Sequence, residues 1–164
     1  MTHEERLAHV IGEVAPVDSA FEQDAWDRLD ALTKPPRSLG RLEEVAARVA
    51  CAQRTLAPDV STKAIILAAG DHGVVAEGVS AYPQDVTWQM VANFSAGGAA
   101  INQLAETVGA QIRLYDVGVA ADVTAIPGVR HAKVAPGTAN MAVGPAMTRE
   151  EAAAAVLVGV EAAE

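Results

Sequence analysis

Two segments expected to be strands, separated by a stretch with helical periodicity, constrain the fold of this chain more than any other feature. The first run, Lys63 to Ala69, leads into Gly70-Asp71-His72-Gly73, and the second, Gln111 to Val117, leads into Gly118. The aliphatic run after Lys63 is typical of a buried strand in a parallel sheet that is covered on both faces. We therefore expect two strands, the first of them buried.

The segment between these runs predicts the connection that a parallel sheet needs. Val86, Met90 and Phe94 recur at helical spacing, and a second helical stretch covers residues 101–108 and ends at Gly109. A strand, a helix and a second parallel strand form a right-handed crossover, so both strands end at the same edge of the sheet. Open parallel sheets bind their ligands at this carboxyl edge, which makes the residues after each strand candidates for a site.

Helical patterns dominate the first 57 residues. A capping box at Thr2 and Glu5 starts one helix, a second capping box at Ser19 and Glu22 starts another, and a third helix is expected from Ser38. These patterns predict a small all-helical part ahead of the sheet.

A stiff loop is expected at residues 32–40, because two successive prolines there exclude a continuous helix. Lys34 in this loop has two possible roles: contact with a phosphate group, or a brace between subdomains, which we favour. In the third helix, Leu42, Val45 and Val49 are expected to form the apolar side.

Together these patterns predict an α/β protein. Residues 1–57 form an N-terminal helical subdomain, and residues 58–164 form the first part of a doubly wound, Rossmann-like parallel sheet. A last helix follows the capping box at Thr148 and Glu151. Two strands plus short extended pieces within residues 129–134 are few for a parallel sheet, so we expect the C-terminal part of this fold to be absent.

Charge and hydropathy exclude several classes of partner. The formal net charge of -9 disfavours nucleic acids and anionic membranes. The apolar runs are much shorter than the ~20 residues that a membrane helix needs. The partners expected are therefore small molecules, bound through local groups rather than through the overall charge.

Cys51 is the single cysteine, so no internal disulfide forms and a cytoplasmic location is expected. Its place in a helical pattern favours a buried, inert thiol over a nucleophile. The four histidines have no metal-ligand spacing, and Gly97-Gly98 lacks the dinucleotide-binding fingerprint. We therefore predict neither a metal nor a cofactor.

Three groups of motifs follow one another from Leu29 onward. The first is residues 32–43, LTKPPRSLGRLE. The second is residues 70–83, GDHGVVAEGVSAYP, continued by Val86-Thr87 and Gln89-Met90-Val91. The third comprises Asn93-Phe94, residues 97–102, Asp116-Val117-Gly118-Val119, Gly137-Thr138, Asn140 and residues 144–149. In this order and spacing the chain resembles the family of nicotinate-nucleotide:dimethylbenzimidazole phosphoribosyltransferases, which usually has glycine in place of Arg37.

The resemblance implies a reaction that assembles the lower ligand of cobalamin, in which the phosphoribosyl group of nicotinate mononucleotide is transferred to dimethylbenzimidazole. The benzimidazole nitrogen attacks the anomeric carbon well only if the other ring N–H is lost, which requires a carboxylate as general base. In the family this base is a glutamate near the far C-terminus, and a second important glutamate lies just beyond the end of this chain. The resemblance thus implies a homodimeric enzyme, and a chain that lacks the catalytic residues and is inactive alone.

The resemblance also implies that this half contributes part of the benzimidazole pocket. The expected substrate-binding residues are Asp71, His72, Tyr82, Pro83, Thr87 and Met90. Some family members have serine and glutamine at the positions of Tyr82 and Met90, so the aromatic substrate can differ.

Each of these assignments has a purely structural alternative. The Asp71-His72 turn could serve only to satisfy backbone donors. Met90, at helical spacing with Val86, is a core residue unless the resemblance holds. Glu77 is equally compatible with positioning a substrate, acting as a weak base, or being a solvated surface acid.

Three other functions stay open at this point. The chain could be a non-catalytic benzimidazole- or nucleotide-binding protein, or one half of a split enzyme that needs a second chain. A generic nucleotide-binding α/β module would prefer mononucleotides and would not depend on Tyr82.

Overall fold

The computed structural model describes residues 1–18 and 20–164, so the capping residue predicted at Ser19 lies outside the described residues. The chain divides into two compact units, one of Gly12–Thr62 and the other of Met1–Ile11 with Lys63–Glu164. The domain boundary that the sequence predicts after residue 57 stays a prediction. By contacts, the first eleven residues belong with the sheet.

The sheet has three parallel strands in the order β1-β2-β3: β1 (Lys63–Gly70), β2 (Ala110–Gly118) and the short β3 (Val129–His131). The register is regular from Lys63 to Ala69, which lies opposite Asp116, and shifts before Gly70. The two predicted strands and their parallel pairing are confirmed. The burial expected for β1 was wrong: each of its residues is exposed or half-buried, because the strand lies at the edge of the described sheet. β1 lies at one edge of the described sheet, and Ile66 in its middle is 41% exposed.

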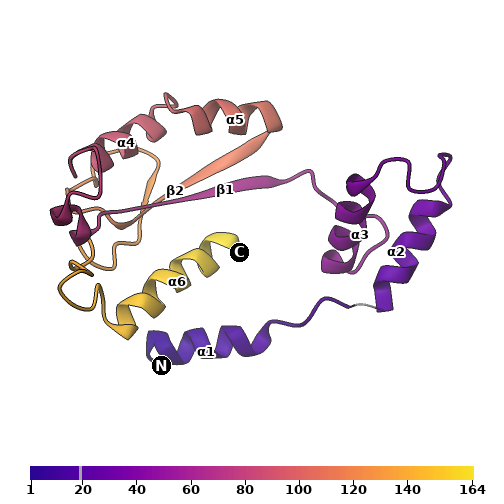
Figure 1. Ribbon diagram of the computed structural model, residues 1–164, viewed down its shortest axis with the longest axis horizontal. Coiled ribbons are helices and arrows are strands. Elements are labelled where there is room, and N and C mark those ends of the chain that lie inside the picture. The colour runs from indigo at the N-terminus through magenta and orange to yellow at the C-terminus, as the bar shows by residue number, and fades with distance from the viewer. Residues whose placement is uncertain (19) are drawn as a thin grey trace. The chain divides into compact units, whose positions relative to one another are not determined.

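Helices lie on both faces of this sheet (Figure 1). α4 (Val86–Ser95) and α5 (Ala100–Val108) connect β1 to β2 along one face, and α6 (Arg149–Ala163) follows the other. Gly109 ends α5 in the left-handed conformation, as expected for a C-cap glycine. The arrangement confirms an α/β fold built on part of a doubly wound sheet.

A valine-rich core joins α4 to the sheet. Val91 on α4 packs with Leu114 on β2 and with Val129 on β3, each of which is buried. Val119 and Val123, from the loop after β2, complete the cluster. Burial of side chains of this size is worth about 1.5–3 kcal/mol each, which fixes the loop against the end of the sheet.

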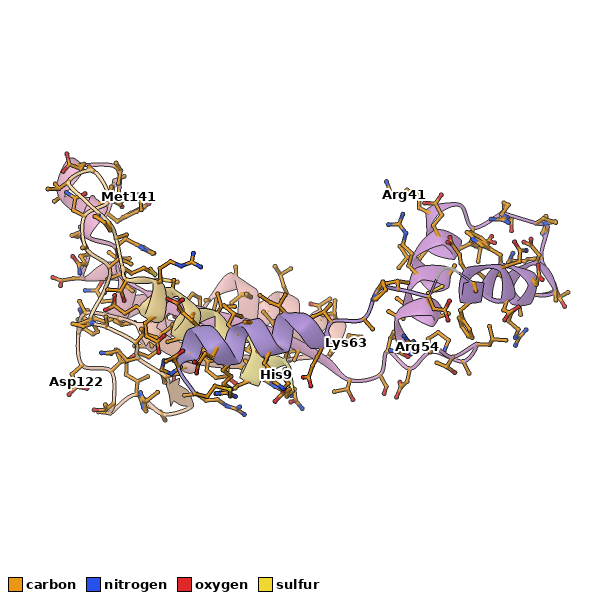
Figure 2. All side chains as sticks on the ribbon, turned by 90° about the horizontal axis from the view of Figure 1, so that it is seen from below. His9, Arg41, Arg54, Lys63, Asp122 and Met141 are labelled. Atoms are coloured by element: carbon orange, nitrogen blue, oxygen red, sulfur yellow. The ribbon has the colours of Figure 1, made fainter. Side chains whose placement is uncertain are left out.

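The first helix, α1 (His3–Glu13), lies beside α6 in both views (Figures 1 and 2). Its N-terminus carries the predicted capping box, in which the Glu5 N–H donates to Thr2 Oγ1 at 3.1 Å. The Glu150 carboxylate of α6 also accepts the His3 N–H at 2.8 Å. The His3 N–H, which has no partner within its own helix, is thereby hydrogen-bonded to a side chain of α6.

The second unit is a pair of packed helices, α2 (Ala20–Asp30) and α3 (Arg41–Gln53). Ala25 of α2 is buried against Ala47 and Ala50 of α3. Small residues at such a contact allow two helices to approach closely.

The apolar side predicted for α3 was wrong. Leu42 and Val45 are 69% and 55% exposed, whereas Glu43 and Cys51 are buried with the alanines. The contact follows the small residues of the helix and one paired carboxylate, and the sequence periodicity alone carried no information about that pairing.

None of the described helices combines the length and apolarity required to cross a membrane.

Lys34 braces the double-proline loop onto α3. Its ammonium lies 2.8 Å from Glu43 Oε2, and the Leu39 N–H donates to Glu43 Oε1 at 2.9 Å. Both residues lie in the helical unit, so Lys34 holds the loop within that unit. The brace between subdomains and the phosphate contact both stay predictions. The hydrogen bond from Lys34, and then that from Leu39, hold the pKa of Glu43 below its ordinary value of 4.5.

Acid is therefore expected to loosen the helical unit. Because the folded-state pKa of Glu43 lies below the unfolded-state value, its contribution is complete above about pH 4.5 and is lost as the pH falls through the folded-state pKa. In a Trp88→Phe background, Trp26 fluorescence reports unfolding of this unit in urea. Glu43→Gln should lower the midpoint at neutral pH, by a margin that shrinks in acid. A margin that stays constant down to about pH 3 would contradict this account.

The backbone conformation at Arg37 explains why glycine would fit this position. Its backbone φ is 60°, in the left-handed region that glycine adopts without strain. The guanidinium compensates by lying 3.6 Å from the centroid of the Trp26 ring and 3.5 Å from Asp30 Oδ2. A cation–π contact of this kind contributes about 0.5–1 kcal/mol at exposed sites.

Candidate functional site

The carboxyl ends of β1 and β2 are tied together by Asp71. Its N–H donates to the Gly118 carbonyl at 2.9 Å, and its Oδ2 accepts the Ala120 N–H at 2.7 Å. The residue is 5% exposed. Both expected readings of Asp71 therefore meet here, since it satisfies a backbone donor and also lies at the edge where a ligand is expected.

Asp116 plays a similar part at the end of β2. Its Oδ1 accepts the Val119 N–H at 2.9 Å, and its Oδ2 lies 3.3 Å from Lys133 Nζ. The residue is 1% exposed. Lys133 also donates to the Ala121 carbonyl at 3.0 Å, so one buried carboxylate and one lysine organise the loop after β2.

Two loops reach the same end of the sheet from different parts of the chain. Figure 2 marks Asp122 and Met141, in the loops after β2 and β3, at the opposite end from Lys63, where β1 begins. His72 forms a parallel bridge with Thr138, and the Gly73 N–H donates to the Thr138 carbonyl at 3.0 Å.

One pocket brings all the predicted substrate-binding residues together. It has a volume of about 510 Å³, and we call it the Tyr82 pocket. It is lined by Asp71, His72, Tyr82, Pro83, Thr87 and Met90. Apolar side chains form much of the remaining wall: Leu67, Val74, Val75, Val79, Val86, Val91 and Phe94. Clefts of this size and composition commonly bind small molecules.

A short turn sets the position of Tyr82 in this pocket. The Ser80 hydroxyl accepts the Tyr82 N–H at 3.1 Å and donates to the Tyr82 carbonyl at 3.0 Å. Tyr82 is 71% exposed, so its ring stands at the mouth of the pocket. Met90 is half-buried on α4, in agreement with a wall residue.

A second, larger pocket of about 810 Å³ lies next to the first, and we call it the Thr148 pocket. The two share residues 68–72, so the end of β1 forms a common wall. The other walls are contributed by residues 134–139, residues 145–149 and α6. The sequence reasoning did not assign this pocket, although the Gly137-Thr138 and 144–149 motifs of the family resemblance were a signal for it.

Ionisable side chains at the two pockets differ in their hydrogen-bond partners and exposure. Asp71 accepts the Ala120 N–H, and Glu151 accepts the Thr148 N–H at 2.7 Å in the capping box of α6. His72 is exposed and lines both pockets. The shared wall therefore offers an imidazole, but its one carboxylate is engaged with the backbone.

Cysteine and metal chemistry have little support here. Cys51 is buried, and burial raises the pKa of its thiol, in agreement with the predicted inert residue. Within residues 1–18 and 20–164, no group of three or more His, Cys, Asp or Glu side chains has a metal-binding arrangement. The absence of a metal and of a cofactor stays a prediction.

A parallel sheet with helices on both faces and two adjoining pockets at its carboxyl edge defines the chain as an α/β protein with a candidate ligand site. Within that class, residues 14–164 match the family model described as phosphoribosyltransferase. The chain therefore belongs to this phosphoribosyltransferase family, as the motif resemblance predicted.

Individual relatives agree with this assignment. Nicotinate-nucleotide–dimethylbenzimidazole phosphoribosyltransferase of Thermus thermophilus is 58% identical over 136 residues, which cover 83% of this chain and 41% of that protein. The protein of the same name from Geobacter sulfurreducens is 52% identical over 157 residues, covering 96% and 45%. A crystal structure of the Thermus thermophilus enzyme superimposes with a TM-score of 0.83 at 55% identity, covering 89% of this chain and 44% of that one. This chain thus spans less than half the length of the curated relatives that it matches.

Proposed function

We propose that this chain takes part in the transfer of a phosphoribosyl group from nicotinate mononucleotide to dimethylbenzimidazole, with the acceptor base in the Tyr82 pocket. One observation carries the proposal: six residues chosen from the sequence, spread from Asp71 to Met90, line a single pocket at the end of β1. The names of the relatives support the choice of substrates.

The two adjoining pockets suit a displacement between two bound molecules. We place the mononucleotide in the Thr148 pocket, with its anomeric carbon at the carboxyl end of β1, where the two pockets border each other. A benzimidazole nitrogen then forms the new bond to this carbon while the bond to the nicotinate nitrogen breaks. Holding both reactants in contact supplies much of the rate enhancement, because little freedom is left to lose in the transition state.

Removal of the proton from the benzimidazole N–H is assigned to a carboxylate outside this chain. The Asp71 carboxylate at the shared wall is engaged by Ala120, and the relatives extend well beyond the matched region. The chain alone is accordingly expected to bind the acceptor and to be inactive, and turnover by the pure chain would contradict this part of the proposal. We further propose a homodimer and a cytoplasmic location, the latter supported by the single buried cysteine.

Titration of dimethylbenzimidazole into the chain by calorimetry tests the pocket assignment. Tyr82→Ala and Met90→Ala should each weaken binding about tenfold, because each removes a large side chain that contacts the ligand in an apolar site. Leu104→Ala is the matched control, since Leu104 is 66% exposed on α5 and does not line the pocket. Preferential binding of mononucleotides that Tyr82→Ala leaves unchanged would instead favour a generic nucleotide-binding module.

A further inference from the structure

The loop that forms the mouth of the Tyr82 pocket is tied to a second loop by one pair of side chains. Glu77 ends the 3-10 helix η1 (Gly73–Glu77), and Asn140 lies in the segment between β3 and α6. Asn140 Nδ2 donates to Glu77 Oε1 at 2.6 Å. Asn140 Oδ1 also accepts the Ala142 N–H at 3.0 Å, so both ends of the amide are engaged.

The backbones of the two loops are in close contact beside this pair. The Gly73 N–H donates to the Thr138 carbonyl, and a Cβ added at Gly73 would lie 2.6–2.8 Å from backbone atoms of residues 138–140. The Ala139 N–H in turn donates to the Ala146 carbonyl at 2.8 Å, which fixes the second loop on itself. The first loop therefore contacts a second loop that is stabilised by an internal hydrogen bond.

Much of the Tyr82 pocket wall depends on the loop that carries Glu77. Val74 and Val75 precede Glu77, and Val79, Ser80 and Tyr82 follow it. The wall residues on both sides of Glu77 thus share its attachment. A shift of Glu77 would move them together, because Gly78 follows in the left-handed conformation and its N–H is bonded to the Val75 carbonyl at 3.0 Å.

We propose that Glu77 and Asn140 are a pair of positioning residues, which hold the loop at residues 73–83 in the shape that accepts a flat heteroaromatic ligand. This inference rests on the proposed function for the identity of that ligand. It assigns Glu77 a role as hydrogen-bond acceptor, distinct from a general base and from a solvated surface acid. The carboxylate needs no proton transfer for this role, so a neutral side chain with an oxygen in the same place should replace it.

Substitutions at Glu77 separate these roles in the full chain. Glu77→Ala removes the acceptor and should weaken dimethylbenzimidazole binding about three- to tenfold, the range expected for one hydrogen bond. Glu77→Gln keeps the side-chain oxygen and should bind within about twofold of the parent. Asn140→Ala should weaken binding at least as much as Glu77→Ala, because it also removes the acceptor of the Ala142 N–H. The double variant should be no weaker than Asn140→Ala. Glu106→Ala, on the exposed side of α5, is the surface control.

Equal losses for Glu77→Gln and Glu77→Ala would overturn the proposal, because a base or a required charge would then explain the result. Additive losses in the double variant would overturn it as well. Unchanged binding in every variant would show that the pair does not shape the pocket.

Hydrogen–deuterium exchange tests the pair without any ligand. Amides of residues 78–82 should exchange faster in Glu77→Ala and Asn140→Ala than in the parent, and at the parental rate in Glu77→Gln. If the parent chain binds no dimethylbenzimidazole but the exchange pattern holds, the proposed ligand is wrong and the positioning pair stands. Parental exchange in all variants would overturn the pair itself.

Discussion

Replacing Gly73 with alanine is expected to lower the free energy of unfolding by about 2–3 kcal/mol and to abolish ligand binding in the Tyr82 pocket. The new Cβ would lie 2.6 Å from the Asn140 nitrogen, 2.7 Å from the Ala139 carbonyl carbon and 2.8 Å from the Thr138 oxygen. All three are backbone atoms, which cannot rotate away as a side chain can. The loops must separate, and the pocket wall moves with them. Urea unfolding and calorimetric titration measure the two effects.

Gly144→Ala is the matched control for this change. Gly144 lies in the same segment between β3 and α6, and an added Cβ there meets nothing within 4 Å. Its stability and ligand affinity should equal those of the parent chain. A stable Gly73→Ala variant with normal binding would show that the two loops are not in the contact described here.

Asp116→Ala is expected to cost about 3 kcal/mol, because it leaves two partners without their acceptor. The Val119 N–H loses a hydrogen bond in a buried setting, and the Lys133 ammonium loses its carboxylate. Both partners organise the loop that contributes Val119 and Val123 to the core. Chemical denaturation followed by circular dichroism measures the loss.

Two further variants divide this loss between its causes. Asp116→Asn keeps an acceptor for Val119 and removes only the charge, so it should cost about 1–2 kcal/mol less than the alanine variant. Lys133→Met removes the ammonium and leaves the buried carboxylate with the hydrogen bond from Val119. If Asp116→Ala unfolded at the same denaturant concentration as the parent, the loop after β2 would be stabilised by apolar packing alone.

The parts of this fold that could be predicted are those with a strong local pattern. The aliphatic run at Lys63 to Ala69 predicts β1 and its carboxyl end correctly. The glycine at 109 predicts the end of α5. The capping box at Thr148 and Glu151 likewise marks the start of α6. In each case neighbouring residues alone determine the structure.

The parts that sequence reasoning missed depend on partners far away in the chain. The buried side of α3 follows its packing on Ala25 of α2 and the pairing of Glu43 with Lys34, whereas apolar periodicity favoured Leu42. The Thr148 pocket is built on a loop whose path is set by bonds such as that from the Thr138 N–H to the Asp71 carbonyl at 3.0 Å. Such a loop has no repeating pattern to read.

The Tyr82 pocket lies between these cases. Motif resemblance was enough to choose six of its lining residues, because they follow one another within a short segment. The tie between Glu77 and Asn140 joins positions 63 residues apart, so the sequence left the role of Glu77 open.

The position of β1 has a consequence for any chain that contains this sheet. On the side away from β2, its peptide groups form a row of donors and acceptors that no described strand satisfies. After Lys63 the strand carries no charge and no proline, the devices by which proteins usually discourage strand addition. Its aliphatic sequence is therefore suited to an interior place in a wider sheet, with a neighbour on each flank.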